Sequence, residues 1–314
     1  MPHPKPHLLS EWRGFLNATA LAIGGMVILG LLGRWIFWFD LLSHVRVYLT
    51  IALVVVSLLL LFAQARLRAM LAFALCLISI GSLAWSLYGS PIKLEQNASA
   101  EISILSFNVL AWNRTPDAAA KLIRESDVDV AVILEAPGIE DQLPSLRDVY
   151  PHQSGCEVSA TCDLVIISKH PFVSIDRPGL VSGADRVAIA ELEIDGKPVH
   201  VAGIHLSKPY YDGVHAWEMS VIRNDLAAID GPLILVGDVN QAPWSAILQR
   251  FMRNARLSAI AGYRPTWPDQ LGLLGVPIDT MLIRGEVGPV SLKVLPNPAG
   301  SNHRALLGAF SLSN

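Results

Sequence analysis

The first third of the chain is dominated by three apolar runs, at residues 14–33, 47–65 and 69–92, that contain no Asp, Glu, Lys or Arg. At a rise of about 1.5 Å per residue, a helix of each run would cross a hydrocarbon core of roughly 30 Å. Trp35, Trp38 and Phe39 follow the first run, where interfacial aromatic side chains are expected. Three buried helices of a water-soluble core are the alternative, but charge-free runs of this length are typical of membrane spans. We therefore predict a membrane anchor of three transmembrane helices over residues 1–93.

The first run is longer than the apolar region of a typical signal peptide, and two similar runs follow it, so we expect an uncleaved anchor. The basic residues that flank the runs favour one orientation, with Lys5, Arg13, Arg66 and Arg68 on one side of the membrane and Arg34, Arg46 and Lys93 on the other. The positive-inside rule then favours a cytoplasmic N-terminus. Three crossings would place everything after about residue 93 outside the cytoplasm.

The pattern changes after a polar linker at residues 94–100, and a single domain is expected over residues 101–314. Short apolar runs predict strands at 102–110, 128–134, 164–168, 187–194, 199–206, 233–236, 278–283, 292–295 and 305–312. Helical spacing predicts helices at 116–125, 215–229 and 244–255. Asp195-Gly196 between two of the strands is a hairpin signal. Many strands with few helices between them indicate two sheets packed on each other with helices outside.

Polar side chains recur where these apolar strands end. Such groups are costly at the end of a buried strand unless they are paired, so a shared rim of polar side chains is a hypothesis for a functional site. Asp238 and Asn240 lie two residues apart, on one face of an extended chain. Together with a histidine from a later loop, they suit metal-assisted attack of water on phosphorus. The residues in question are Asn108, Glu135, His205, Asp238, Asn240, Asp279 and His303.

These motifs, in this order, resemble the endonuclease/exonuclease/phosphatase superfamily, which shares its fold with DNase I and neutral sphingomyelinases. The resemblance covers about residues 100 to 314 and implies a four-layer α/β sandwich. A bacterial subgroup has a similar membrane-spanning N-terminus, so we expect a bacterial inner-membrane protein with a periplasmic catalytic domain. The resembling motifs are Ser106-Phe107-Asn108, Leu134-Glu135, Gly203-Ile204-His205-Leu206, Gly237-Asp238-Val239-Asn240, Thr266-Trp267-Pro268, Pro277-Ile278-Asp279 and Ser301-Asn302-His303-Arg304.

The resemblance implies a divalent cation, Mg²⁺ with Mn²⁺ as a substitute. Glu135 would ligate it with Asn108 beside it, since oxygen ligands suit a hard ion. The family usually has aspartate where this chain has Asn302. An amide oxygen is a weaker ligand without charge, so one or two metal ions remain open.

The resemblance also assigns catalytic roles. Asp238 would activate the attacking water and Asn240 would hold that water or a phosphate oxygen. His303, oriented by Asp279, would stabilise the charge that develops on the phosphoryl group, and His205 would contact the phosphate or assist the leaving group. Phosphate contacts would come from Asn108, Asn240, His205, His303 and Arg186. The expected activity is hydrolysis of a phosphodiester.

Charge bears on the substrate. The first 96 residues carry a net charge of +4 and the remainder −7, which together give the −3 of the whole chain. An acidic domain is a poor partner for a nucleic-acid backbone. A lipid-linked phosphodiester fits a catalytic domain held close to a bilayer, and a small-molecule phosphodiester or phosphomonoester is the next choice. A periplasmic nuclease and a non-catalytic binding module that retains the fold are the alternatives. No protein partner is evident.

The three cysteines indicate whether the domain lies in an oxidising compartment. Cys76 lies in the third apolar run, whereas Cys156 and Cys162 lie close together in a polar stretch. A disulfide between the latter two would need an oxidising compartment. The alternative is two unrelated thiols, because this spacing is poor for a zinc site.

Overall fold

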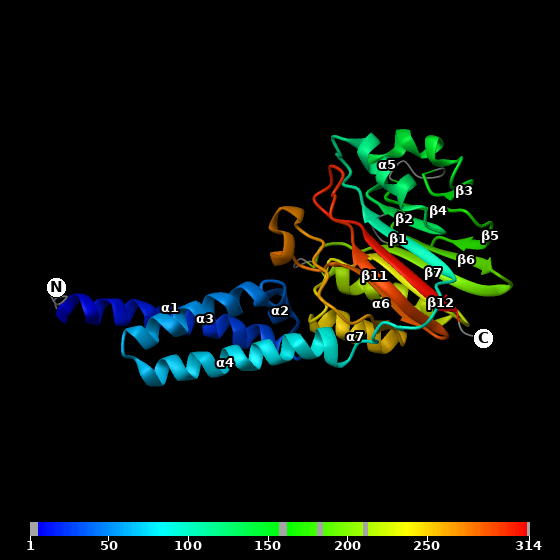
Figure 1. Ribbon diagram of the computed structural model, residues 1–314. Coiled ribbons are helices and arrows are strands. Elements are labelled where there is room, and N and C mark those ends of the chain that lie inside the picture. The colour runs from blue at the N-terminus through cyan, green and yellow to red at the C-terminus, as the bar shows by residue number, and fades with distance from the viewer. Residues whose placement is uncertain (1–5, 157–161, 181–184, 210–212, 313–314) are drawn as a thin grey trace. The chain divides into compact units, whose positions relative to one another are not determined.

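The computed structural model describes residues 6–156, 162–180, 185–209 and 213–312. It divides the chain into two compact units, one formed by Met1–Gly89 with Trp244–Leu248 and the other by Ser90–Pro243 with Gln249–Asn314. Figure 1 shows the first as a set of long helices and the second as a body built on strands.

The first unit contains α1 (Pro6–Leu32), α2 (Phe37–Asp40), α3 (Arg46–Phe62) and α4 (Arg66–Ala84), the last extended by a π-helical turn, Trp85–Gly89. Within the described residues, two helices, Ser10–Leu32 and Arg66–Gly89, are long and apolar enough to cross a membrane, and the pair Phe37–Ser43 and Arg46–Phe62, bent by 66°, adds a third if it counts as one span. The middle run is thus shorter than predicted, since α3 ends before Gln64, whose φ of 62° is left-handed.

The helices of the first unit meet along a narrow strip. Val27, Leu53 and Cys76 are fully buried there, and the Thr50 and Ser79 hydroxyl oxygens lie 2.7 Å apart in a hydrogen bond. Only 22% and 17% of the most apolar 18-residue window of the two long helices is buried. Most of the apolar surface of these helices therefore remains exposed within the first unit.

The second unit contains two six-stranded sheets. The first has the order β11 (Val287–Val294), β12 (Leu306–Leu312), β1 (Ile102–Asn108), β2 (Val130–Leu134), β4 (Leu164–Ser168), β3 (His152–Ser154). The second has the order β5 (Phe172–Asp176), β6 (Val187–Ile194), β7 (Lys197–His205), β8 (Leu233–Asp238), β10 (Asp279–Arg284), β9 (Ser258–Ala259). The apolar pattern does not predict the short strands β3 and β9 or the edge strand β5.

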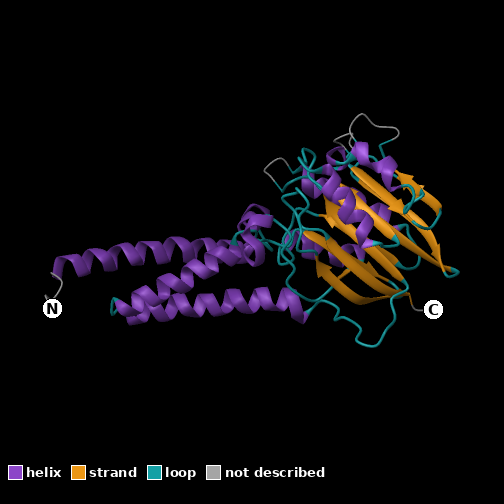
Figure 2. Ribbon diagram, turned by 45° about the horizontal axis from the view of Figure 1, so that its top comes forward, coloured by secondary structure: helices purple, strands orange, loops and turns teal. Residues whose placement is uncertain are grey.

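The two sheets face each other across one apolar core, to which Val132 and Ile166 contribute from the first sheet and Val201 and Val236 from the second. Helix α5 (Pro116–Ser126) packs on the outer face of the first sheet. Its residue Ile123 is part of a second apolar core between the helix and that sheet. Figures 1 and 2 show helices on the outside of both sheets. The predicted α/β arrangement of two packed sheets between helices is confirmed.

On the outer side of the second sheet lie α6 (Val214–Ala227) and α7 (Ala246–Ala255). Arg284 of β10 joins them, because its guanidinium donates to the Leu226 carbonyl at 2.8 Å and the Ala255 carbonyl at 3.1 Å. The stretch expected as a linker is itself bound to the second unit, since the Glu95 N–H donates to the Pro289 carbonyl at 2.8 Å.

Strand register brings three of the predicted residues together. His205 at the end of β7 pairs with Asp238 at the end of β8, because these strands run parallel. Asp279 begins β10, which runs antiparallel to β8, and pairs with Asp238 from the other side. The second sheet therefore places two carboxylates and an imidazole side by side at one edge.

Candidate active site

Asp238 lies between two histidines at this edge. Its Oδ2 is 4.0 Å from His205 Nε2 and 3.9 Å from His303 Nε2. All three side chains are buried. His303 comes from the loop before β12 and not from the second sheet. A carboxylate between two imidazoles can exchange a proton with a bound water while the imidazoles face an anionic group.

Each histidine is held from its other nitrogen by a carboxylate. His303 Nδ1 lies 2.9 Å from Asp279 Oδ2, and His205 Nδ1 lies 2.5 Å from Asp163 Oδ2. An acceptor at Nδ1 fixes the ring orientation and leaves Nε2 to face the site. Asp163 was not among the residues selected from the sequence.

The carboxylates also decide the charge of the histidines. Burial alone lowers the pKa of His303, but the Asp279 carboxylate outweighs it and raises that pKa to about 9. Burial likewise opposes protonation of His205, and the hydrogen bond with Asp163 raises its pKa. Burial and the neighbouring Asp279 raise the pKa of Asp238 to about 6. Near pH 7 the site therefore holds an ionised Asp238 next to a protonated His303.

The turn that presents Asp238 depends on glycine. Gly237 has a φ of 141°, and a β-carbon there would collide with the carbonyl of Ile204 on the neighbouring strand. After the strand, Asn240 turns back with a φ of 49°, so that its N–H donates to Asp238 Oδ1 at 2.8 Å. The Asn240 amide donates to the Leu206 carbonyl at 2.8 Å. Its contact with water or phosphate stays a prediction.

Asn108 and Glu135 form the part of the site that belongs to the first sheet. Asn108 Nδ2 donates to Glu135 Oε1 at 3.0 Å and to Asp238 Oδ2 at 3.3 Å, so it bridges the two carboxylates. Its oxygen accepts the Leu110 N–H at 3.1 Å, which fixes this amide orientation. Glu135 follows β2 in a left-handed conformation, φ 53°, a strained geometry that is common at functional sites.

A cation would find oxygen ligands at this place. The Oδ1 atom of Asn302 is buried and has no hydrogen-bond partner within the described part of the chain. Ligand atoms of Asp238, Asp279 and His303 lie within 4.8 Å of one another, although Asp279 is already bound to the imidazole. Carboxylate and amide oxygens are the donors that Mg²⁺ prefers, so the residues present fit a hard divalent cation.

Arg186, a predicted phosphate contact, lies behind His205. Its Nη1 donates to Ser207 Oγ at 2.8 Å, and its Nε is 3.6 Å from Asp163 Oδ2. The fully buried carboxylate of Glu218 accepts from the Ser207 N–H at 2.7 Å and from its hydroxyl at 2.9 Å. Arg186 is thus part of a network that supports the His205 side of the site, and its contact with phosphate stays a prediction.

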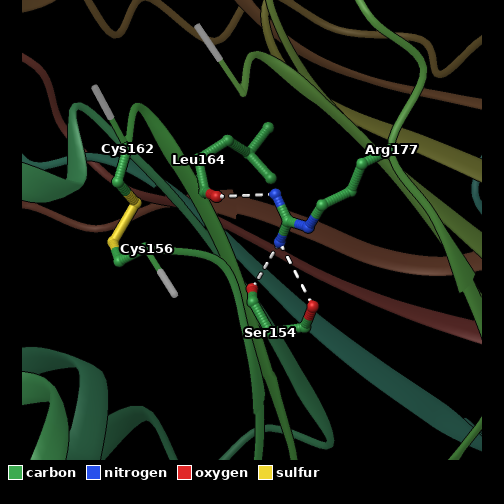
Figure 3. The surroundings of a disulfide bond; sticks show 5 residues. All are labelled: Ser154, Cys156, Cys162, Leu164 and Arg177. Carbon is green, nitrogen blue, oxygen red and sulfur yellow. Dashed lines mark hydrogen bonds between the residues drawn. A yellow bond between two sulfur atoms is a disulfide. The ribbon is translucent and has the colours of Figure 1, made fainter. Parts of the chain in front are cut away.

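A disulfide between Cys156 and Cys162 lies directly before Asp163. Figure 3 shows the Arg177 guanidinium reaching across to the neighbouring strands, where it donates to the carbonyls of Ser154 and Leu164 at 2.5 and 3.2 Å. In the sequence, the one signal that could have identified Asp163 is its position directly after Cys162. The carboxylate itself becomes recognisable only once the fold brings it to His205.

Comparison with known proteins gives one family. The family model described as Endonuclease/Exonuclease/phosphatase family matches residues 105–303, which include all the strand-end residues named above. No curated protein sequence matches the chain.

Solved structures share the fold. The human Nocturnin catalytic domain with bound sulfate has 16% identity and a TM-score of 0.55, with 68% of this chain and 94% of that chain covered. A mutant beta toxin from Staphylococcus aureus with bound magnesium ions has 19% identity and a TM-score of 0.51, with 67% and 99% covered. Sphingomyelinase C from Streptomyces griseocarneus has 18% identity and a TM-score of 0.50, with 67% and 99% covered.

Proposed function

Because the chain belongs to the endonuclease/exonuclease/phosphatase family, we propose that it is a membrane-anchored, magnesium-dependent phosphodiesterase whose catalytic domain faces the periplasm. The main support for catalysis is the position of Asp238. One of its oxygens, Oδ2, lies 4.0 Å from His205 Nε2 and 3.9 Å from His303 Nε2. This arrangement offers a carboxylate base and two imidazole hydrogen-bond donors within reach of one phosphoryl group.

In the proposed reaction, Asp238 orients a water molecule and takes its proton as the water oxygen attacks phosphorus. A carboxylate with a pKa of about 6 is ionised at neutral pH and is still basic enough for this step. His303, whose pKa is about 9, keeps its proton and donates a hydrogen bond to a phosphoryl oxygen as negative charge grows there. His205 stands on the other side of Asp238, where it can protonate the leaving oxygen.

A magnesium ion would be held by Glu135, with Asn302 and Asn108 as amide neighbours. The buried, unpartnered Oδ1 of Asn302 and the bound magnesium of the beta toxin neighbour support this assignment. When bound, the ion would neutralise phosphate oxygens and so favour attack by water. The bridge from Asn108 to Glu135 and Asp238 would keep the metal ligand and the base at a fixed separation.

The apolar N-terminal helices support the membrane part of the proposal, because two of them, or three with the bent pair, are long and apolar enough to cross a bilayer. The excess of basic residues on the side of the N-terminus favours placing the domain in the periplasm of a bacterium. The disulfide between Cys156 and Cys162 fits that oxidising compartment.

The test is hydrolysis of bis(4-nitrophenyl) phosphate by the full chain in detergent, with magnesium and with EDTA. We expect magnesium-dependent turnover, which should fall by a factor of about 10²–10⁴ or more in Asp238→Ala and in His303→Ala. Asp141→Ala, an exposed carboxylate, and His152→Ala, a histidine of β3, are the matched controls. Full activity in either site variant would refute the assignment.

Asn302 supports a second candidate, a binding module that retained the fold without catalysis. That module would show no turnover of a phosphodiester, a phosphomonoester or DNA, and its melting temperature would not respond to magnesium. Turnover of DNA with a steep decrease in affinity at higher salt would instead identify a nuclease.

A further inference from the structure

A short 3₁₀ helix beside the site, η5 (Asp269–Leu274), carries an exposed apolar tip. The exposed fractions are 45% for Leu271, 83% for Leu273 and 55% for Leu274. Residues 270–276 contain no charged side chain. Figure 1 shows this orange segment projecting from the second unit, away from the strands. Single exposed leucines are common on soluble domains, but three on one uncharged turn form a surface that avoids water.

The tip is fixed to the segment that holds the catalytic histidine. The Asp269 N–H donates to the Asn302 carbonyl at 2.8 Å, and Arg304 Nε donates to Asp269 Oδ1 at 3.1 Å. The ring of Trp267, at the start of the turn, lies 6.4 Å from the ring of His303. The only carboxylate of the turn is thus paired with an arginine, and the turn that carries the leucines is bound to the segment next to His303.

A second exposed apolar side chain, Trp112, lies on the loop that contacts Glu135. Trp112 is 85% exposed. The residue before it, Ala111, donates its N–H to Glu135 Oε2 at 2.8 Å, and the residue after it, Asn113, donates from Nδ2 to the Ala299 carbonyl at 3.1 Å. The Trp112 loop is therefore bound to the site from which it projects. Arg114, close behind, is exposed.

The chemistry of these two projections matches a bilayer interface. Exposed tryptophan, leucine and a nearby arginine are the side chains that insert at the boundary between head groups and acyl chains. Insertion into a bilayer requires no surface of complementary shape, but it requires that the inserted segment carry no unpaired charge. Residues 270–276 meet this requirement. The same chain also carries apolar spans, one of which ends at Gly89, directly before the second unit begins at Ser90.

We propose that the tip of η5 and Trp112 enter the interface of a lipid bilayer, and that the substrate is a phospholipid whose phosphodiester head group lies in that interface. This inference rests on the proposed function for its chemistry, but the docking surface can be tested without catalysis. The lipid tails would remain in the bilayer while the phosphodiester reaches Asp238 and the two histidines.

Docking is tested first, with the full chain in vesicles of phosphatidylcholine and phosphatidylglycerol. In a Cys76→Ser background, which removes the free thiol, Leu273→Cys is labelled with an environment-sensitive fluorophore. Nitroxide lipids should quench this label. Val173→Cys is the matched control, because Val173 is 62% exposed on the edge strand β5. Figure 1 shows β5 at the right of the second unit and the orange η5 at its left. Absence of quenching at residue 273, or equal quenching at both positions, overturns the docking surface and leaves a protein partner as its occupant.

Substrate class is tested next by the ratio of phospholipid turnover to turnover of bis(4-nitrophenyl) phosphate. We expect Leu273→Asp to lower this ratio by about tenfold or more, since a charged tip resists insertion, and Val173→Asp to leave the ratio unaltered. Turnover of the soluble diester without any turnover of phospholipid overturns the substrate class alone. Quenching without any hydrolysis would keep the docking surface and refute the proposed function.

Discussion

Asp279 Oδ2 lies 2.9 Å from His303 Nδ1, and both side chains are buried. Burial by itself would favour the neutral imidazole, yet the buried carboxylate outweighs it and raises the pKa of His303 to about 9. The His303 imidazole therefore keeps its positive charge near the place where a phosphoryl group would develop negative charge. Asp163 and His205 repeat the relationship on the other side of Asp238, with 2.5 Å between them.

The first prediction concerns the alkaline side of the pH profile. Because the pKa of His303 is raised, the protonated form dominates below about pH 9 and is lost as the pH rises through that value. A kcat/KM that needs this proton should fall above about pH 9. Asp279→Asn removes the charge that raises the pKa, so the fall should move to lower pH by about one unit or more. Kinetics on the soluble diester from pH 6 to 10 measure this shift. An unmoved alkaline limb would show that His303 does not act in its protonated form.

The second prediction concerns the disulfide. Cys162 directly precedes Asp163, so the disulfide restrains the carboxylate that orients His205. Replacing both cysteines by serine should lower kcat by about 10- to 100-fold, because small misplacements of catalytic groups have effects of that size. It should also lower the free energy of unfolding by about 2 kcal/mol, the value expected for a short loop.

A dithiol reductant separates the disulfide's role from the effect of the substitutions. It should reduce the activity of the wild-type chain and leave that of the double serine variant as it was. Asp163→Asn, measured in parallel, should lower kcat with the disulfide intact. Wild-type activity in the double serine variant would mean that the position of Asp163 does not depend on the disulfide.

The third prediction concerns the metal. Magnesium should raise the melting temperature of the wild-type chain, because a ligand at 100 times its Kd adds about 2.7 kcal/mol to stability. Glu135→Gln should remove most of this increase. Asn302→Asp should lower the magnesium concentration needed for half of the increase by about tenfold, since a carboxylate adds charge where the amide has none. Equal magnesium responses in all three proteins would place the ion elsewhere.

How well the sequence predicts a helix or strand depends on the pattern of apolar residues in that element. Strands such as Leu164–Ser168 are recognisable because the first four residues are apolar, and all five residues of the strand are buried. The edge strand Phe172–Asp176 is not recognisable in this way. Its side chains are partly or fully exposed, and buried and exposed positions do not alternate regularly along it. The span predicted at 47–65 ends early for a local reason, the left-handed Gln64, which apolar content does not reveal.

The same limit applies to the site. Asp238 and His205 can be selected from sequence because each ends an apolar run, and Asp279 because it stands where one begins. Strand register then aligns the three residues. Asp163 follows a cysteine in a polar stretch, and only the fold brings it to His205, 42 residues away. Arg186 shows the converse case, since its position at a strand start does not reveal that Ser207 and Asp163 already engage it.

The last prediction tests why glycine precedes the catalytic aspartate. With a φ of 141° and the Ile204 carbonyl directly in the path of a β-carbon, Gly237→Ala must shift the end of β8 and with it Asp238. We expect a loss of about 2–4 kcal/mol in the free energy of unfolding and a large drop in kcat. Gly196→Ala is the matched control, because Gly196 also has a positive φ, 79°, but no heavy atom lies within 4 Å of a β-carbon there. That control should cost only about 1 kcal/mol and leave kcat close to wild type. Equal losses in the two variants would mean that the left-handed backbone alone, and not the close approach of β7 to β8, requires glycine before Asp238.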